Sequence, residues 1–161
     1  MTAPMGRPWW WTPPTHRGAE MTDPRDPNQQ RTVVPRPAAL PYLSVPDARR
    51  AIEWYAEAFG ARVDGEPVMM PDGRVGHCEL AIGEGTLYLA DEFPEIGFTA
   101  PSPGRSGVSL MLPVTDTDAT LERARATGAT VEREPATENG HRGATLVDPF
   151  GHRWMLAGPI G

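Results

Sequence analysis

The sequence predicts an α+β protein made of two consecutive βαβββ units, because its signals for strand, helix and turn occur twice in the same order. A Val-x-Asp segment precedes a predicted helix at Asp47 and again at Asp116. A Gly-Ala-x-Val segment follows each of these helices, at Gly60 and at Gly128. Matching positions lie about 68 residues apart along the chain, which indicates an internal repeat.

The first unit begins with a short apolar strand over residues 40–45. Asp47 then provides an N-cap side chain, and apolar residues follow at helical spacing. Gly60 is expected to end this helix in the left-handed conformation that glycine adopts readily. Turns at residues 71–73 and 84–85 divide the remainder of the unit into three strands.

The second unit repeats this plan. Its opening strand is expected over residues 108–114 and its helix over residues 117–127. The turn sequences Asn-Gly at 139–140 and Asp-Pro-Phe-Gly at 148–151 separate the three strands that follow.

Proline and polar residues set the N-terminal segment apart from these units. Residues 1–37 are rich in proline and show neither helical nor strand periodicity, so we expect a disordered or poorly packed tail. The domain then covers residues 38–158: unit 1 at about 38–95, a linker at about 96–106, and unit 2 at about 107–158.

Composition restricts the partners. The formal net charge of −6 disfavours binding to nucleic acid or to an anionic membrane and favours a neutral or cationic partner. No apolar run approaches the roughly 20 residues needed to span a bilayer. The only cysteine, Cys78, cannot form an intramolecular disulfide, and this suits the reducing cytoplasm.

The repeated plan resembles the vicinal oxygen chelate superfamily of glyoxalases, bleomycin-resistance proteins and dihydroxybiphenyl dioxygenases. The most specific segment is Asp-Pro-Phe-Gly-His-Arg-Trp at 148–154, an Asp-Pro-x-Gly turn followed by an apolar strand. The segments at 41–45, 51–61 and 77–80 add to the likeness. The resemblance implies an eight-stranded curled cup with its helices outside, a ligand cavity inside the cup, and a homodimer.

Metal-dependent members of that superfamily hold a divalent ion on His, Gln or Glu side chains from the first and last strands of each unit. The matching positions here are Leu40, Leu87, Ser109 and Met155. Leucine and methionine cannot ligate a hard cation, and a single neutral serine is a poor ligand. We therefore expect neither a metal ion nor another cofactor.

Strand alternation indicates which side chains face the cup. If Cys78 and Leu80 face a helix, His77 and Glu79 lie on the opposite face, where an imidazole and a carboxylate can act as a general acid/base pair. The alternative is that His77 only hydrogen-bonds across the sheet while Glu79 faces water. The remaining expected ligand-binding residues are Tyr42, Ser44, Leu87, Ser109, Met111, Arg153 and Met155.

Three functions remain open from the residues and the resemblance. The first is a metal-free protein that binds and sequesters a small organic molecule, as a resistance protein would. The second is a metal-independent isomerase or lyase that uses His77 and Glu79. The third is a metal-dependent lyase or dioxygenase of the glyoxalase type, which the missing ligands disfavour. The fold alone cannot decide among them.

Overall fold

The computed structural model describes residues 39–102 and 104–160. Within the described residues, every helix and strand lies in the part of the chain from Leu40 to Gly161. The predicted tail, residues 1–37, lies outside the described residues.

Both predicted units are present in the predicted order. The first unit comprises β1 (Tyr42–Val45), α1 (Ala48–Phe59), β2 (Arg62–Met69), β3 (Val75–Ile82) and β4 (Gly85–Asp91). A short 3₁₀ helix, Pro94–Ile96, opens the linker. The second unit comprises β5 (Ser109–Pro113), α2 (Thr117–Ala126), β6 (Thr130–Glu138), β7 (His141–Val147) and β8 (Arg153–Gly158).

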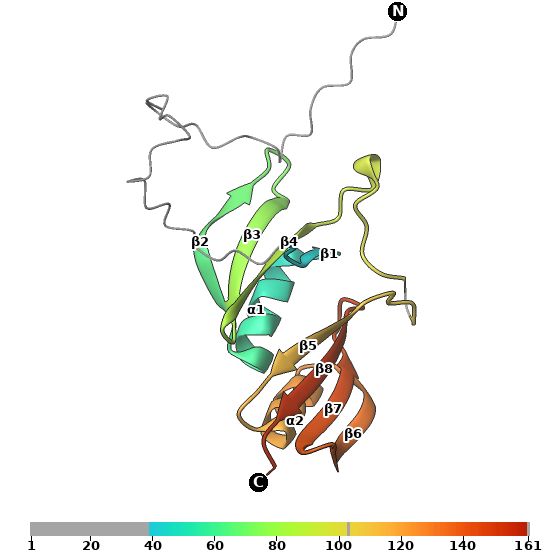
Figure 1. Cartoon of the computed structure of the whole chain (residues 1–161). Helices are drawn as coiled ribbons and strands as arrows, with labels where there is room; N and C mark the ends of the chain where they lie inside the picture. The colour runs from blue at the N-terminus through green and yellow to red at the C-terminus, as the bar shows by residue number, and fades with distance from the viewer. Residues whose placement is uncertain (1–38, 103, 161) are drawn as a thin grey trace, which may run out of the picture. The chain divides into compact units, whose positions relative to one another are not determined.

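The strands form two four-stranded mixed sheets, in the orders β1-β4-β3-β2 and β5-β8-β7-β6 (Figure 1). In each sheet the first strand of the unit pairs parallel with the last, and the other neighbours are antiparallel. The α+β class and the tandem βαβββ plan are thus confirmed. Both sheets are open, and among the described strands no backbone pairing joins one sheet to the other.

The two helices begin where the sequence predicts. The carboxylate of Asp47 accepts a hydrogen bond from the backbone N–H of Arg50, and that of Asp116 accepts one from Ala119, at 3.0 Å and 2.9 Å. Gly60 ends α1 with φ of 70°, a conformation that costs glycine little. Within the described residues, neither helix is long and apolar enough to cross a membrane.

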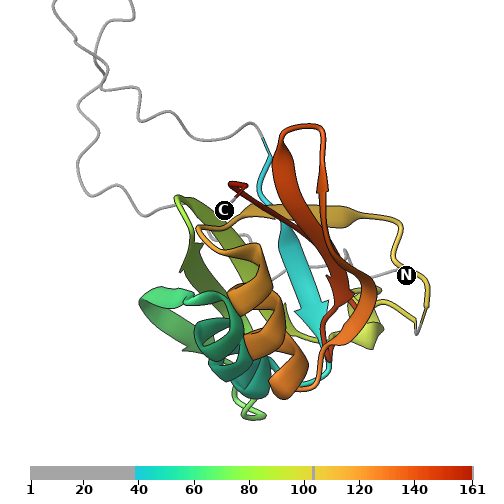
Figure 2. The same ribbon diagram turned by 90° about the horizontal axis from the view of Figure 1, so that it is seen from below.

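Apolar side chains of β1, β3 and β4 pack beneath α1, with Leu43, Leu80 and Leu89 almost fully buried. α1 and α2 lie side by side (Figure 2). An aromatic cluster joins α1 to the second unit, and Trp54 donates its indole N–H to the carbonyl oxygen of Thr127 at 3.1 Å. The cluster consists of Trp54, Tyr55, Phe59, Phe150 and Trp154.

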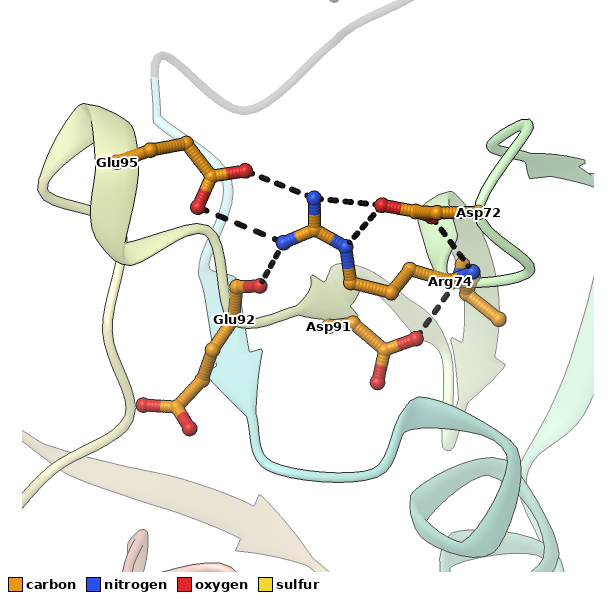
Figure 3. Close-up of polar contacts among 6 residues, drawn as sticks. Asp72, Arg74, Asp91, Glu92 and Glu95 are labelled. Carbon is orange, nitrogen blue, oxygen red and sulfur yellow. Dashed lines mark hydrogen bonds and ion pairs between the residues drawn. The ribbon is translucent and has the colours of Figure 1, made fainter.

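Arg74 fixes the start of the linker against the β2–β3 turn (Figure 3). Its guanidinium lies between the carboxylates of Asp72 and Glu95, at 2.7 Å from each, and donates to the carbonyl oxygen of Glu92. The same group lies 4.0 Å from the centre of the Phe93 ring, within range of a cation–π interaction. The linker therefore leaves the first unit in a defined direction.

Candidate functional site

His77 and Glu79 lie on the face of the first sheet that is opposite α1. Their neighbours on β3, Cys78 and Leu80, are buried beneath the helix, as the alternation of the strand requires. The side chain of His77 is 29% exposed and that of Glu79 is 41% exposed. The pair is thus accessible on an open sheet surface.

Both ring nitrogens of His77 have partners within the protein. Nδ1 lies 2.9 Å from the hydroxyl of Tyr42, and Nε2 lies 3.4 Å from Oε1 of Glu79. The Tyr42 hydroxyl also lies 3.2 Å from the carbonyl oxygen of Gly76. The Tyr42 hydroxyl has one proton: if it goes to the carbonyl of Gly76, Nδ1–H of His77 donates to the hydroxyl oxygen, and if it goes to Nδ1, Nε2–H donates to Glu79.

Tyr42 remains protonated at neutral pH in this environment. Burial, with smaller contributions from the nearby Cys78 and Tyr88 groups, raises the pKa of its hydroxyl to about 12. Tyr42 is consequently a hydrogen-bonding group here and a poor general base.

Aromatic rings surround this pair. Tyr42 lies 5.5 Å from His77, 5.8 Å from Tyr88 and 5.3 Å from Phe98, measured between ring centres. His77 and Tyr88 are 4.9 Å apart in an edge-to-face arrangement. We call Tyr42, His77, Tyr88 and Phe98, together with Glu79, the aromatic patch.

The structure places Leu87 away from this patch. Leu87 pairs with Leu80 and is buried on the helix side, whereas Tyr88 pairs with Glu79 and Tyr42 on the open side. The expectation that Leu87 shares a face with Tyr42 is therefore wrong by one residue. The connection between β3 and β4 spans residues 83–84, whereas the connection between β7 and β8 spans residues 148–152. The repeat distance of about 68 residues therefore does not align the residues of β4 with those of β8.

The predicted residues of the second unit form a separate group on the other sheet. Arg153 donates to the Ser109 hydroxyl and to the carboxylate of Glu132, each at 2.7 Å. Met111 pairs with Met155 and is 63% exposed. Glu132 was not predicted, because its role depends on the pairing of distant strands.

Two cavities lie near β1 and β5. One, of about 430 Å³, includes Tyr42 and Ser44 in its lining. The other, of about 570 Å³, includes Leu87 and Met111. His77 and Glu79 line neither of these two cavities. The predicted site residues are thus divided among two sheet faces and two cavities.

Residues 36–156 match the family described as the glyoxalase, bleomycin resistance protein and dioxygenase superfamily. The chain belongs to this superfamily. It is also 40% identical over 131 residues to an uncharacterized protein of Mycobacterium bovis, with 77% of this chain and 84% of that protein covered.

Solved structures share the fold of this chain. A gene product of Arabidopsis thaliana is 26% identical with a TM-score of 0.61, covering 76% of this chain and 98% of its own. The fosfomycin resistance protein FosX of Mesorhizobium loti is 16% identical with a TM-score of 0.56, covering 78% and 93% respectively.

The residues of this superfamily member do not fit the metal site that the resemblance implied. The positions that the resemblance implied carry Leu40, Leu87, Ser109 and Met155, and the Ser109 hydroxyl accepts a hydrogen bond from Arg153 at 2.7 Å. Hydrocarbon and thioether side chains are poor ligands for hard divalent cations, and so is a serine hydroxyl beside a cationic guanidinium. Among residues 39–102 and 104–160, no group of three or more His, Cys, Asp or Glu side chains could hold a metal ion.

Proposed function

We propose that this chain binds a planar organic cation on the aromatic patch and acts as a binding protein. Electron-rich rings attract cations, and the carboxylate of Glu79 adds a negative charge at the edge of the patch. The net charge of −6 favours the approach of a cation from a distance. A small-molecule ligand also agrees with the superfamily fold.

One observation favours binding over proton transfer. The two nitrogens of His77 face Tyr42 and Glu79, so the imidazole has no nitrogen directed toward a substrate. A general base must reach the proton that it removes. A metal-independent isomerase or lyase that uses His77 and Glu79 would have to break this arrangement in each turnover.

We further propose that a second copy of the chain packs against exposed apolar residues at the edges of the two sheets. Four apolar residues on or beside edge strands have exposed side chains: Val68, Met69, Val108 and Met111. β1 and β5 are edge strands with unpaired backbone groups on one side, and such edges favour pairing. Sedimentation of the full chain should give twice the monomer mass, and a stable species near 17.5 kDa would contradict the dimer.

The cytoplasm remains the compartment that we propose. Cys78 is a free thiol and is buried beneath α1. Its burial raises the pKa of the thiol, and the charge of Glu79 acts in the same direction. Both effects disfavour the thiolate, as expected of a packing residue in a reducing environment.

Calorimetric titration with N-methylacridinium, compared with uncharged acridine at neutral pH, tests the binding proposal. The two molecules have nearly the same shape and differ in charge. We expect tighter binding of the cation, with recovery of unchanged ligand by mass spectrometry. Equal affinities would contradict the cation preference, and a chemically altered ligand would favour the enzyme.

A further inference from the structure

The cavity of about 430 Å³ has features that the aromatic patch does not explain. It is bounded by β1, by the linker on both sides of residue 103, by the start of β5 and by the β7–β8 connection. Its size suits a ligand with a single ring. Most of its wall is apolar, with contributions from Leu43, Phe98, Pro101, Val108 and Leu110.

Two buried polar atoms in residues that line this cavity lack hydrogen-bond partners. These are the hydroxyl oxygen of Ser44 and Nδ1 of His152, in side chains of residues that are 6% and 8% exposed. Buried polar groups nearly always form hydrogen bonds, because leaving one unsatisfied is costly. Both atoms belong to residues that line the same cavity, so a ligand with a polar group at its buried end can supply the missing partner.

Asp148 does not satisfy His152, although its Oδ1 lies 3.7 Å from Nδ1. Its Oδ1 already accepts from the backbone N–H groups of Phe150 and His152, both at 2.9 Å. Its Oδ2 accepts from the hydroxyl of Tyr55 at 2.6 Å and from the indole of Trp154 at 2.8 Å. Four donors fill the acceptor positions of a carboxylate, so the imidazole is left for another partner.

The charges near the cavity set the polarity of that ligand. The carboxylate of Asp148 beside His152 disfavours a second anion at the buried end, so a neutral hydroxyl fits best there. Arg105 is exposed, also lines the cavity and forms no side-chain hydrogen bond within the described residues. Its guanidinium can pair with a carboxylate at the mouth.

We propose that this cavity is a second binding site, for a small aromatic acid that carries a hydroxyl group at the end opposite its carboxylate. The hydroxyl bonds with Ser44 and His152, the ring lies against the apolar wall, and the carboxylate pairs with Arg105. This cavity is a different site from the aromatic patch, although Tyr42 and Phe98 belong to both.

NMR titration of the full chain with three probes tests the assignment: 4-hydroxyphenylacetate, phenylacetate and 4-methylphenol. The first should bind about three- to tenfold more tightly than either of the others, because each of those lacks one polar contact. No binding of the first probe, or equal affinity for the first two, would overturn the proposal.

Variants separate the two polar contacts. Ser44→Ala should weaken 4-hydroxyphenylacetate and leave phenylacetate unchanged, while Arg105→Gln should weaken both acids and leave 4-methylphenol unchanged. Arg49→Gln, an exposed arginine on α1, is the control for lost charge. If Ser44→Ala weakened the two acids equally, the hydroxyl contact would be disproved.

Two further measurements keep the result clear. Ser44→Ala removes a hydroxyl that has no partner, so the melting temperature without ligand should not fall. A fall would mean that the Ser44 hydroxyl already has a hydrogen-bond partner, and it would overturn the assignment of this hydroxyl to ligand binding. In the NMR titration, 4-hydroxyphenylacetate should shift the backbone signals of Val108 and Leu110, which line this cavity, and not that of Glu79, which does not. Shifts centred on Glu79 would place the acid on the aromatic patch instead.

Discussion

The hydroxyl of Tyr55 on α1 donates a 2.6 Å hydrogen bond to the carboxylate of Asp148, 93 residues further along the chain. Both groups are buried, and Tyr55 is fully enclosed. Burial raises the pKa of Tyr55 well above 10.0, and the negative charge of Asp148 adds to that effect. This bond joins the helix of the first unit to the β7–β8 connection of the second.

Tyr55→Phe should therefore lower the free energy of unfolding by about 1–3 kcal/mol, because it leaves a buried carboxylate with one donor fewer. Urea unfolding measures the change. Tyr88→Phe removes a hydroxyl that forms no hydrogen bond within the described residues, and serves as the control. Equal effects of the two substitutions would contradict a special role for the Tyr55 bond.

Protonation of the Asp148 carboxylate should make the folded chain less stable in acid. Burial would raise the pKa of its carboxyl group, but the neighbouring His152, Tyr55 and Trp154 outweigh burial and hold the pKa below 3.8. The unfolded chain then binds the proton more readily than the folded chain. The stabilisation is present above the unfolded pKa of about 4 and is lost as the pH falls through the lower folded value.

Urea unfolding between neutral pH and about pH 2 checks this expectation. Asp148→Asn should be less stable at neutral pH by about 2–5 kcal/mol, because it removes a buried, fully bonded charge. It should also lose less stability on acidification than the original chain. An acid dependence that is unchanged in Asp148→Asn would show that other carboxylates are responsible.

Local sequence patterns predicted most of the fold and only part of the site. Helix caps such as Asp47, and the face shared by His77 and Glu79, depend on near neighbours in the chain, so they could be inferred from the sequence. Leu87 was assigned to the wrong face because the lengths of the two hairpin connections differ. The surroundings of Ser44 depend on the path of the linker, which no local pattern encodes.

Arg74 should control the local stability of the linker rather than that of the whole chain. Arg74→Gln removes the ion pairs with Asp72 and Glu95 and the contact with Phe93. Because the two ion pairs are partly exposed to solvent, we expect faster amide exchange at residues 93–97 and little change in melting temperature.

Hydrogen exchange read by mass spectrometry measures the effect of Arg74→Gln. Arg125→Gln is the matched control, because Arg125 forms exposed ion pairs with Glu122 and Glu134 in the second unit. That variant should leave exchange at residues 93–97 unchanged. Unaltered exchange there in Arg74→Gln would mean that backbone contacts alone hold the linker.

Glu79 and His77 distinguish a binding protein from an enzyme. In the binding proposal, Glu79→Gln removes the charge that favours a cation on a partly exposed surface, so N-methylacridinium should bind up to about fivefold more weakly. Acridine should bind as before. Glu57→Gln removes the same charge from an exposed position on α1 and should change neither affinity.

His77→Gln separates the two functions further. If His77 only supports the aromatic patch through Tyr42 and Glu79, its loss should weaken the binding of N-methylacridinium by about three- to tenfold. No reaction product should form at any stage. If His77 transfers protons, the variant should keep its affinity while product formation falls by about a hundredfold or more. Mass spectrometry of a metabolite extract incubated with each variant measures both quantities, and a product that disappears with His77 would replace the binding proposal with the enzyme.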